Sequence, residues 1–438
     1  MRNSVVLAVS ALLLLSALAC GQAQEAETTW VYEATGSSDP GATAVDDPEA
    51  LDGRALECPA SDKTWSGWPT FTSGYTMEYL PGEYEVRFRL KVADNTGPNP
   101  LFDLGVENGG IWEHPRGIDF KDPGKYQEFV YSFIIKTPVL NICIVRKLAG
   151  SKAWIDRVTV IRKRLYTDLE QLAFAKFERP DNPQLLPHEG TRVWFVKGLY
   201  YQHYHLHTLL ERMGATVDYA YIVRGQRGSA LAGVPLQGEP TEKKEQATAD
   251  GEKGGLTPHP APDPYDVVML RDLIVLCDAD AECLTVAQKA MIQDFVKAGG
   301  GLLVVGGPFA FGRGAMERSD LLEPLLPVTI PGFYDLKPLP APAPLQPAEG
   351  RVPKEELAWN GQPMVMWMHQ VQPKPGAAVE MTAGGQPALV TWEYGKGRVA
   401  ALTVTVLGEP PAGSTAFWEW AEWPELMTRV VQWLLPRQ

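Results

Sequence analysis

The stretch "GLLVVGGPFAFGRG", residues 301 to 314, reads as a buried strand followed by a glycine-rich turn. In many α/β enzymes a turn of this kind presents a nucleophile at the carboxyl end of a strand. Here the turn offers only Gly306 and Gly307. Their backbone amides, together with an arginine, are groups that hold a carboxylate, a phosphate or a sugar hydroxyl. The turn therefore favours ligand binding over covalent catalysis.

Other predicted strand ends add side chains to this candidate pocket. "TRVWFVKG" and "YDVVMLRD" read as buried strands, so Lys197 and Gly198 follow one strand and Arg271 and Asp272 follow another. The predicted pocket residues are His203, Arg271, Asp272, Gly306, Gly307, Phe309 and Arg313. In the alternative interpretation, the glycines only allow close packing, and Arg271 and Asp272 form a surface pair.

The string "HYHLH" lies in "LYYQHYHLHTLLERMG", which reads as a helix. On a helix, His203 and His207 are one turn apart and His205 points to the other side, so at most two of them share an ion. The segment has no H-E-x-x-H pattern and no evident carboxylate partner. We therefore expect neither a metal ion nor a cofactor, and His203 is kept as a polar pocket residue.

The length and charge of the chain limit its class. A chain of 438 residues with 45% hydrophobic residues is long enough for two cores, so two domains are expected. The formal net charge of −13, without a cluster of Lys and Arg, argues against nucleic acid as a partner.

Residues 1–23 have the pattern of a secretory signal, with Arg2, an apolar run and small residues before Cys20. "ALAC" resembles a bacterial lipobox, which would make Cys20 the lipidated first residue and a lipid anchor the only membrane contact. Ordinary signal cleavage is the alternative. We expect an extracytoplasmic location, either as a cell-envelope lipoprotein or as a secreted protein. Four further cysteines allow the disulfides Cys58–Cys143 and Cys277–Cys283, or buried thiols.

Residues 27–164 alternate polar and apolar residues in short segments such as "GEYEVRFRLKVAD" and "AWIDRVTVIR", which predicts an antiparallel β-sandwich. With "YEAT" and "DPEALDGRALEC", these segments resemble the galactose-binding-like jelly rolls of carbohydrate-binding modules. The resemblance implies a glycan ligand. Trp65, Trp68 and Trp112 lie in turn-rich stretches and are candidates for stacking on a sugar ring. Alternatively, they pack over the end of the sandwich.

After a linker predicted at 165–185, residues 186–438 alternate apolar strands with helices, which predicts a parallel sheet covered on both faces. A helix over 286–298 has a T-x-x-Q capping box at its start and Gly299 or Gly300 at its end. Residues 225–264 are rich in Gly, Pro and charge and are expected to be a mobile insertion. "LKPLPAPAPLQPAEGRVPKEE" is expected to be extended.

"YDVVMLRD", "DFVKAGGGLLVVGGPFAFGRG", "YGKGRVAALTVTV" and the tail "FWEWAEWPELMTRVVQWLL" together resemble the glutamine amidotransferase-like domains of secreted bacterial proteins. The resemblance implies a flavodoxin-like fold related to class I amidotransferases. Active members place a Cys after the strand equivalent to 302–305, with a later His as its base. This chain has Gly306 or Gly307 there and no His near "TVTVLGEP", so glutaminase activity is not expected.

Three functional hypotheses follow. The first is an exported, envelope-anchored binding protein for a glycan or small polar ligand, with a catalytically degenerate amidotransferase-like domain. The second is a carbohydrate-active or other hydrolase that uses an unrecognised site at the strand ends. The third is a structural subunit of a surface complex.

Overall fold

The structure is a computed structural model that describes residues 28–34, 41–62, 70–72, 77–136, 139–221, 265–354 and 356–436. The chain divides into two compact units, Met1–Tyr166 and Thr167–Gln438, and each is described by itself. The predictions for residues 1–23 with Cys20, for Trp65 and Trp68, and for 225–264 lie outside the described residues. Within the described ranges, no helix is both long and apolar enough to span a membrane.

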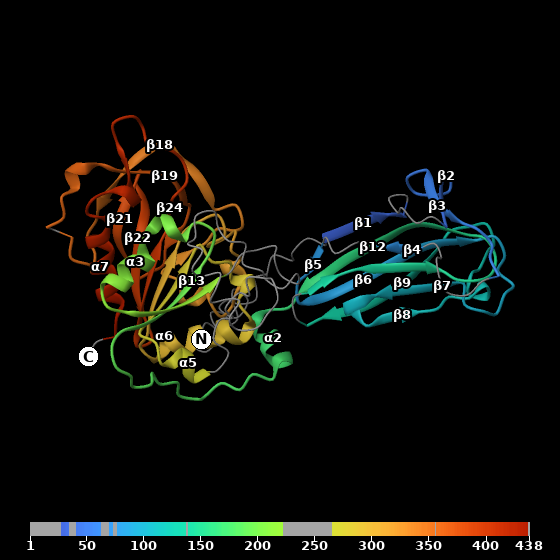
Figure 1. The fold of residues 1–438 in the computed structure, drawn as a ribbon, viewed down its shortest axis with the longest axis horizontal. Helices are drawn as coiled ribbons and strands as arrows, with labels where there is room; N and C mark the ends of the chain where they lie inside the picture. Colours follow the sequence, from blue (N-terminus) through green and yellow to red (C-terminus); the bar gives the residue numbers. More distant parts are fainter. Residues whose placement is uncertain are drawn as a thin grey trace, which may run out of the picture. The chain divides into compact units, whose positions relative to one another are not determined.

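The first unit is an antiparallel β-sandwich (Figure 1). One sheet has the order β2-β3-β12-β6-β9, and β1 also pairs with β12. Its strands are β1 (Thr28–Glu33), β2 (Thr43–Asp46), β3 (Arg54–Cys58), β6 (Gly82–Val92), β9 (Gln127–Ile135) and β12 (Ala153–Leu165). In β6, buried residues alternate with half-buried ones up to Leu90, as expected for a strand with one face on the core.

The second sheet of this unit has the order β4-β11-β7-β8. Its strands are β4 (Thr70–Thr72), β7 (Phe102–Val106), β8 (Ile111–Glu113) and β11 (Cys143–Lys147), and a separate pair is formed by β5 (Met77–Tyr79) and β10 (Val139–Asn141). Phe88, Leu104, Val145 and Val160 belong to one buried core cluster to which both sheets contribute. The predicted β-sandwich is therefore confirmed.

The second unit is built on an eleven-stranded mixed sheet. Five neighbouring strands are parallel, in the order β14-β13-β15-β16-β23. Their bounds are β13 (Arg192–Lys197), β14 (Thr216–Tyr221), β15 (Leu273–Cys277), β16 (Gly301–Val305) and β23 (Gly397–Leu402). Numbered along the chain, this order is 2-1-3-4-5, the order of flavodoxin-like sheets. The predicted α/β class is confirmed.

Helices cover both faces of the parallel part of the sheet. On one face, α3 (Leu206–Arg212) and α7 (Trp423–Leu434) form a core cluster with every second residue of the strands. On the other face, α5 (Tyr265–Met269) and α6 (Val286–Ala298) form a second core cluster with the strand residues in between. Leu303 faces the first cluster, and Leu302 and Val304 face the second. This two-sided burial explains why the strands read as continuous apolar runs.

The sheet continues beyond β23 with antiparallel strands, an extension that the repeated strand and helix pattern did not predict. They are β18 (Leu336–Pro347), β19 (Pro363–His369), β21 (Ala378–Ala383), β22 (Gln386–Tyr394) and β24 (Val404–Thr405), with β25 (Thr415–Ala416) beside β19. A small separate sheet pairs β17 (Val328–Thr329) with β20 (Gln372–Pro373). The proline-rich stretch forms β18, whose register slips between Pro338 and Ala343.

The predicted helix over 286–298 is confirmed as α6. The Gln288 amide donates to Thr285 Oγ1 at 3.2 Å, and the Thr285 amide donates to Gln288 Oε1 at 2.9 Å. Gly299 ends the helix with a φ of +124°. Both signals were local in sequence, which is why the boundaries were predictable.

Two other predicted elements are wrong. "YDVVMLRD" is not a strand, because residues 265–269 form α5 and the strand is β15, which begins at Leu273. The predicted helix around "HYHLH" is interrupted, because His205 has a φ of +55° and separates a 3-10 helix at Tyr201–Tyr204 from α3. His203 and His207 therefore do not share one helix.

The predicted linker at 165–185 also needs correction. Residues Asp168–Ala175 form the helix α2, which begins with a capping box at Thr167 and Glu170. Lys289 of α6 donates to Asp168 Oδ1 at 2.8 Å, so this helix is part of the second unit. Of the two alternatives for the four described cysteines, disulfides or thiols, the structure has thiols: Cys58, Cys143 and Cys277 are buried, and Cys283 is half-buried.

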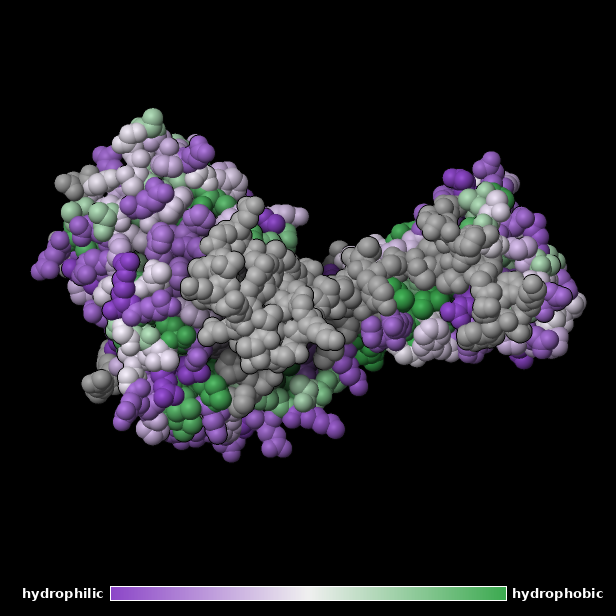
Figure 2. Space-filling model, viewed as in Figure 1, coloured by the Kyte–Doolittle hydropathy of each residue, from purple (hydrophilic) through white to green (hydrophobic). Residues whose placement is uncertain are grey.

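Hydrophilic and intermediate residues cover most of the described surface in Figure 2, and the hydrophobic areas are small. The large hydrophobic side chains that are exposed include Val130, Ile134, Trp112, Phe333 and Tyr334.

Candidate functional site

The Gly306–Gly307 turn follows β16 at the carboxyl edge of the parallel sheet. The Gly306 amide donates to the Leu402 carbonyl at 2.7 Å, and the Gly307 amide donates to Nε2 of His369 at 3.2 Å. The Tyr204 hydroxyl donates to the Gly306 carbonyl at 2.8 Å. Both amides that were predicted to hold a ligand are thus already bonded within the protein.

Asp278 fills the space beside Gly307. It follows β15 with a φ of +51°, and a Cβ at Gly307 would lie 2.2 Å from its Oδ1. Its carboxylate accepts the Phe309 amide at 2.7 Å and the Tyr200 amide at 3.3 Å. Burial raises the pKa of Asp278 to about 7, although these amides act in the opposite direction. A carboxyl group therefore occupies the centre of this edge.

His369 and Asp335 form a buried pair at the same edge. His369 Nδ1 lies 2.8 Å from Asp335 Oδ2, and neither side chain is exposed. Because the other ring nitrogen accepts the Gly307 amide, Nδ1 carries the proton and donates it to Asp335. The Gly312 amide also donates to Asp335 Oδ2, at 3.2 Å. This pair ties the loop after β16 to the end of β19.

These groups do not form a nucleophile and base pair. The lone pair of His369 Nε2 is occupied by Gly307, and no thiol stands in the turn. Cys277, at the end of β15, is fully buried in the apolar core, and burial raises the pKa of its thiol far above the usual range. The observed network holds three loops together and presents no reactive group to solvent.

The predicted pocket residues separate to opposite edges of the sheet. His203 is exposed near the ring of Tyr200, and Phe309 and Arg313 lie in the loop after β16, so these three are at the carboxyl edge. Arg271 and Asp272 precede β15 and lie at the amino edge, which corrects their predicted position. The error followed from taking α5 for the strand.

At the amino edge, both residues of this pair are engaged. Arg271 Nη2 lies 2.7 Å from Asp218 Oδ2, and Asp272 Oδ2 accepts the Arg192 amide at 2.9 Å.

At the carboxyl end of β13, Lys197 is buried with its amine 3.7 Å from the ring centre of Tyr219. The Gly198 amide donates to the Cys277 carbonyl at 2.8 Å. Arg271 and Asp272 therefore lie apart from the Gly307 turn, whereas Gly198 lies at the carboxyl edge against the backbone of Asp278.

The sequence interpretation missed Asp278, Asp335 and His369. Asp278 had a local signal, because it directly follows the apolar run "LIVLC" at 273–277. His369 had none, since it is 62 residues from Gly307 in the chain and reaches it only through the position of β19.

In the first unit, Trp112 lies on a strand of the sandwich, β8, and not in a loop as predicted. Gly105 of β7 is its cross-strand partner. A Cβ at Gly105 would lie 2.8 to 3.0 Å from three consecutive atoms of the six-membered ring of Trp112, so a flat face of the indole covers the glycine. The side chain is 51% exposed. Gly105 thus allows an indole to lie flat on the outer face of the sheet.

Polar side chains lie on the same face of the sheet as this indole, among them the nearly buried Asp103. Asp103 and Gly105 share the outer face of β7, because Phe102, Leu104 and Val106 face the core. Asp103 Oδ1 lies 2.8 Å from His114 Nδ1, and its Oδ2 lies 3.8 Å from Arg146 Nη1. An exposed ring face beside a carboxylate, an imidazole and a guanidinium matches the apolar face and hydroxyl rim of a sugar.

A pocket of about 610 Å³ lies among loops of the same unit. Its lining residues are Ser61, Asp62, Asp94, Gly97, Asn99, Pro100, Leu101, Leu148, Ala149, Gly150 and Ser151. Asp94 already accepts the amide of Thr96, at 2.9 Å. No aromatic side chain lines this pocket, so the Trp112 face is the better candidate for sugar stacking.

Carboxylates of Glu33, Asp52 and Asp156 come within 4.8 Å of one another, a spacing that suits a metal ion. However, the Arg157 guanidinium lies among them, 3.0 Å from Glu33 Oε1 and 3.2 Å from Asp156 Oδ1. Arg89 Nε adds a second contact to Asp156 at 2.7 Å. Two arginines therefore offset most of the acidic charge of these three carboxylates.

Comparison with known families supports the resemblance of the second unit. Residues 264–436 match the model of a family described as "Putative glutamine amidotransferase". The match includes β15, β16 and β23, while β13 and β14 of the same sheet precede it. No curated protein matches the chain.

Solved structures are similar to parts of the chain. A cytoplasmic protein from Salmonella typhimurium is 20% identical with a TM-score of 0.41, over 56% of this chain and 99% of that one. A carbohydrate-binding module of a Cellvibrio mixtus lichenase, solved with cellotriose, is 10% identical with a TM-score of 0.22, over 31% and 98%. A family 35 carbohydrate-binding module from Clostridium thermocellum is 16% identical with a TM-score of 0.23, over 30% and 97%.

Proposed function

We propose that this chain is an extracytoplasmic glycan-binding protein that uses the Trp112 face of its β-sandwich. The observation that carries the proposal is the indole lying flat over Gly105, half exposed, on the sheet face that also carries Asp103, His114 and Arg146. Stacking on a ring and hydrogen bonding at its edge are the two interactions that sugar recognition requires.

Glycan-array screening of the purified chain, followed by calorimetry with the best oligosaccharide, tests this proposal. Trp112→Ala should weaken binding at least about tenfold, equivalent to about 1.4 kcal/mol. Tyr334→Ala is the matched control, because it removes an aromatic side chain that is 80% exposed in the other unit. Full affinity in Trp112→Ala, or an equal loss in both variants, would reject the Trp112 face as the glycan site.

We further propose that the amidotransferase-like unit does not hydrolyse glutamine. Support comes from Gly306 and Gly307 at the nucleophile position and from the occupied lone pair of His369. Purified protein should release no ammonia from glutamine above the buffer rate. Release that is abolished by His369→Ala in folded protein would show that the site is active.

Export and anchoring through Cys20 remain part of the proposal, supported by the signal-like residues 1–23. Expressed in a bacterial host, the chain should sediment with membranes, and Cys20→Ala should release it. If the unsubstituted protein is equally soluble, ordinary secretion replaces the lipoprotein interpretation. Release of reducing sugar from the bound glycan would instead favour the hydrolase hypothesis.

A further inference from the structure

The "YGKGR" string at 394–398 forms a turn between β22 and β23 that packs against the end of α6. A Cβ at Gly395 would lie 2.9 Å from Lys297 Cα, and one at Gly397 would lie 2.2 Å from the Val296 carbonyl oxygen. The Lys396 amide donates to the Lys297 carbonyl at 3.2 Å. The two glycines thus let the turn sit on the helix end, and Lys396 extends from it, exposed.

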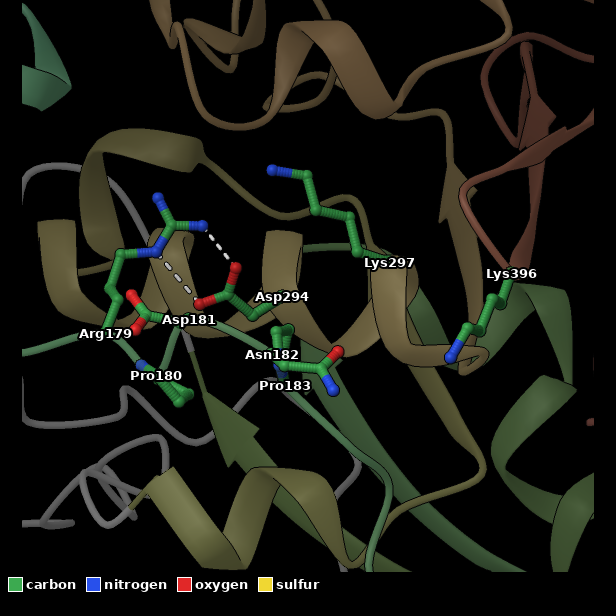
Figure 3. A pocket seen from close by; sticks show the side chains of 8 residues that line it. All are labelled: Arg179, Pro180, Asp181, Asn182, Pro183, Asp294, Lys297 and Lys396. Carbon is green, nitrogen blue, oxygen red and sulfur yellow. Dashed lines mark hydrogen bonds and ion pairs between the residues drawn. The ribbon is translucent and has the colours of Figure 1, made fainter.

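Lys396 lines a pocket of about 330 Å³ (Figure 3). The other lining residues are Arg179, Pro180, Asp181, Asn182, Pro183, Asp294 and Lys297. In the close view, Lys396 extends toward Asn182, while Lys297 extends toward the side on which Arg179 lies. Three cationic side chains from three segments of the second unit therefore line one small cavity.

Two of these cations are held on one neutral oxygen. Arg179 Nη2 and Lys297 Nζ each donate to Gln293 Oε1 at 3.0 Å. The Gln293 amide nitrogen donates to the Leu321 carbonyl at 3.0 Å, which fixes the direction of its oxygen. Like charges held this close repel each other unless an anion joins them.

The acidic groups of the pocket only partly balance these charges. Asp294 is bonded to Arg179, with Nε at 2.9 Å from its Oδ2, and Tyr265 also donates to it. Asp181 is exposed at the rim. Three cations face two carboxylates, and one of these carboxylates is committed to the arginine that lies deepest. On the other side of the pocket, the Lys396 side chain extends toward Asn182 (Figure 3).

We propose that this pocket binds the phosphate or sulfate group of a small molecule, with Lys396, Lys297 and Arg179 as its cationic ligands. A tetrahedral oxyanion accepts several charge-assisted hydrogen bonds at once and relieves the repulsion around Gln293. The volume exceeds that of the bare ion and lies at the lower end for small-ligand sites. The inference is independent of the Trp112 face, since every lining residue belongs to the second unit.

A purely structural explanation gives the lysines a different role. Cationic side chains at the end of a helix interact favourably with its exposed carbonyls. Under that explanation, Lys396→Gln lowers the melting temperature in anion-free buffer, and the protein has no saturable site for phosphate.

Calorimetric titration of the full chain with inorganic phosphate, at constant ionic strength set with sodium chloride, separates the two explanations. We expect saturable one-site binding, weakened about tenfold or more in Lys396→Gln and in Lys297→Gln because each loses a charge-assisted contact. Sulfate should compete with phosphate, and acetate should compete less well because it is planar and singly charged.

Lys337→Gln is the matched control, since Lys337 is an exposed lysine on β18 that does not line the pocket. It should bind phosphate as the unsubstituted protein does. Absence of saturable binding, or equal weakening in Lys337→Gln and Lys396→Gln, would overturn the proposal. Thermal melts of all variants in anion-free buffer show whether each one is folded before it is titrated.

Discussion

At the scale of single residues, Asp278 is the clearest source of pH dependence. Burial raises its pKa from 3.8 to about 7 in the folded protein. The folded state therefore holds this proton more tightly than the unfolded state, and the free energy of unfolding falls as pH rises from about 4 to about 7. A difference of one pKa unit between the folded and unfolded states corresponds to about 1.4 kcal/mol, so the ionisation of Asp278 lowers the free energy of unfolding by up to about 4 kcal/mol.

Asp278→Asn should reduce that loss, because the amide cannot ionise but its oxygen still accepts the Phe309 amide. Urea unfolding of the second unit at pH 4.5 and 7.5 measures the difference between the two proteins. Some pH dependence should remain, since burial also raises the pKa of Glu317 to about 7. Glu356→Gln, at an exposed carboxylate, is the control. If the free energy of unfolding changes with pH in Asp278→Asn as much as in the unsubstituted protein, this explanation is wrong.

A second residue-scale prediction concerns Glu380, which is buried and accepts Lys354 Nζ at 2.7 Å and Thr391 Oγ1 at 2.6 Å. Burial alone would raise its pKa, but these donors and the Arg351 and Val352 amides lower it overall. Lys354→Met should destabilise the second unit by about 3–5 kcal/mol, because it leaves a buried carboxylate without its cation. In the double variant Lys354→Met/Glu380→Gln, the loss of stability should be smaller, because no buried charge is left unpaired. Chemical denaturation measures the stability of both variants. A double variant as unstable as Lys354→Met alone would contradict the charge explanation.

At the scale of elements, sequence reasoning succeeded where the signals were local. The capping box and terminal glycine predicted α6, and continuous apolar runs predicted β13 and β16. It failed where a neighbouring element decides the conformation. A single residue with positive φ, His205, divides the predicted helix, and pairing with β7 makes a strand of the segment that holds Trp112. The buried contact between His369 and Gly307 could be predicted only from the strand order of the whole sheet.

The turn of β22 and β23 gives a prediction at this scale. Gly397→Ala should lower the stability of the second unit by about 1–3 kcal/mol, because the new methyl group would overlap the Val296 and Gly300 carbonyl oxygens. Gly97→Ala is the control, since nothing lies within 4 Å of the added Cβ. Thermal melting compares the two variants. A Gly397→Ala protein as stable as the control would mean that the turn moves away from α6 easily.

At the scale of the whole molecule, the change from a two-residue period to alternating strands and helices predicted two domains. The structure places the division at Tyr166 and Thr167, because α2 caps itself at Thr167 and contacts α6. The antiparallel extension of the second sheet was not predicted. Its prolines and short runs carry no helix or strand period of their own, and they become strands only by pairing with one another.

The two units should therefore unfold separately. The core cluster of the sandwich contains only residues of the first unit, and the two clusters around the mixed sheet contain only residues of the second. Leu104→Ala and Leu303→Ala each remove a fully buried side chain from one unit, at a cost of about 2–5 kcal/mol. In differential scanning calorimetry of the full chain, each variant should lower the melting temperature of one transition and leave the other in place. A single transition that shifts in both variants would show that the two cores unfold as one cooperative unit.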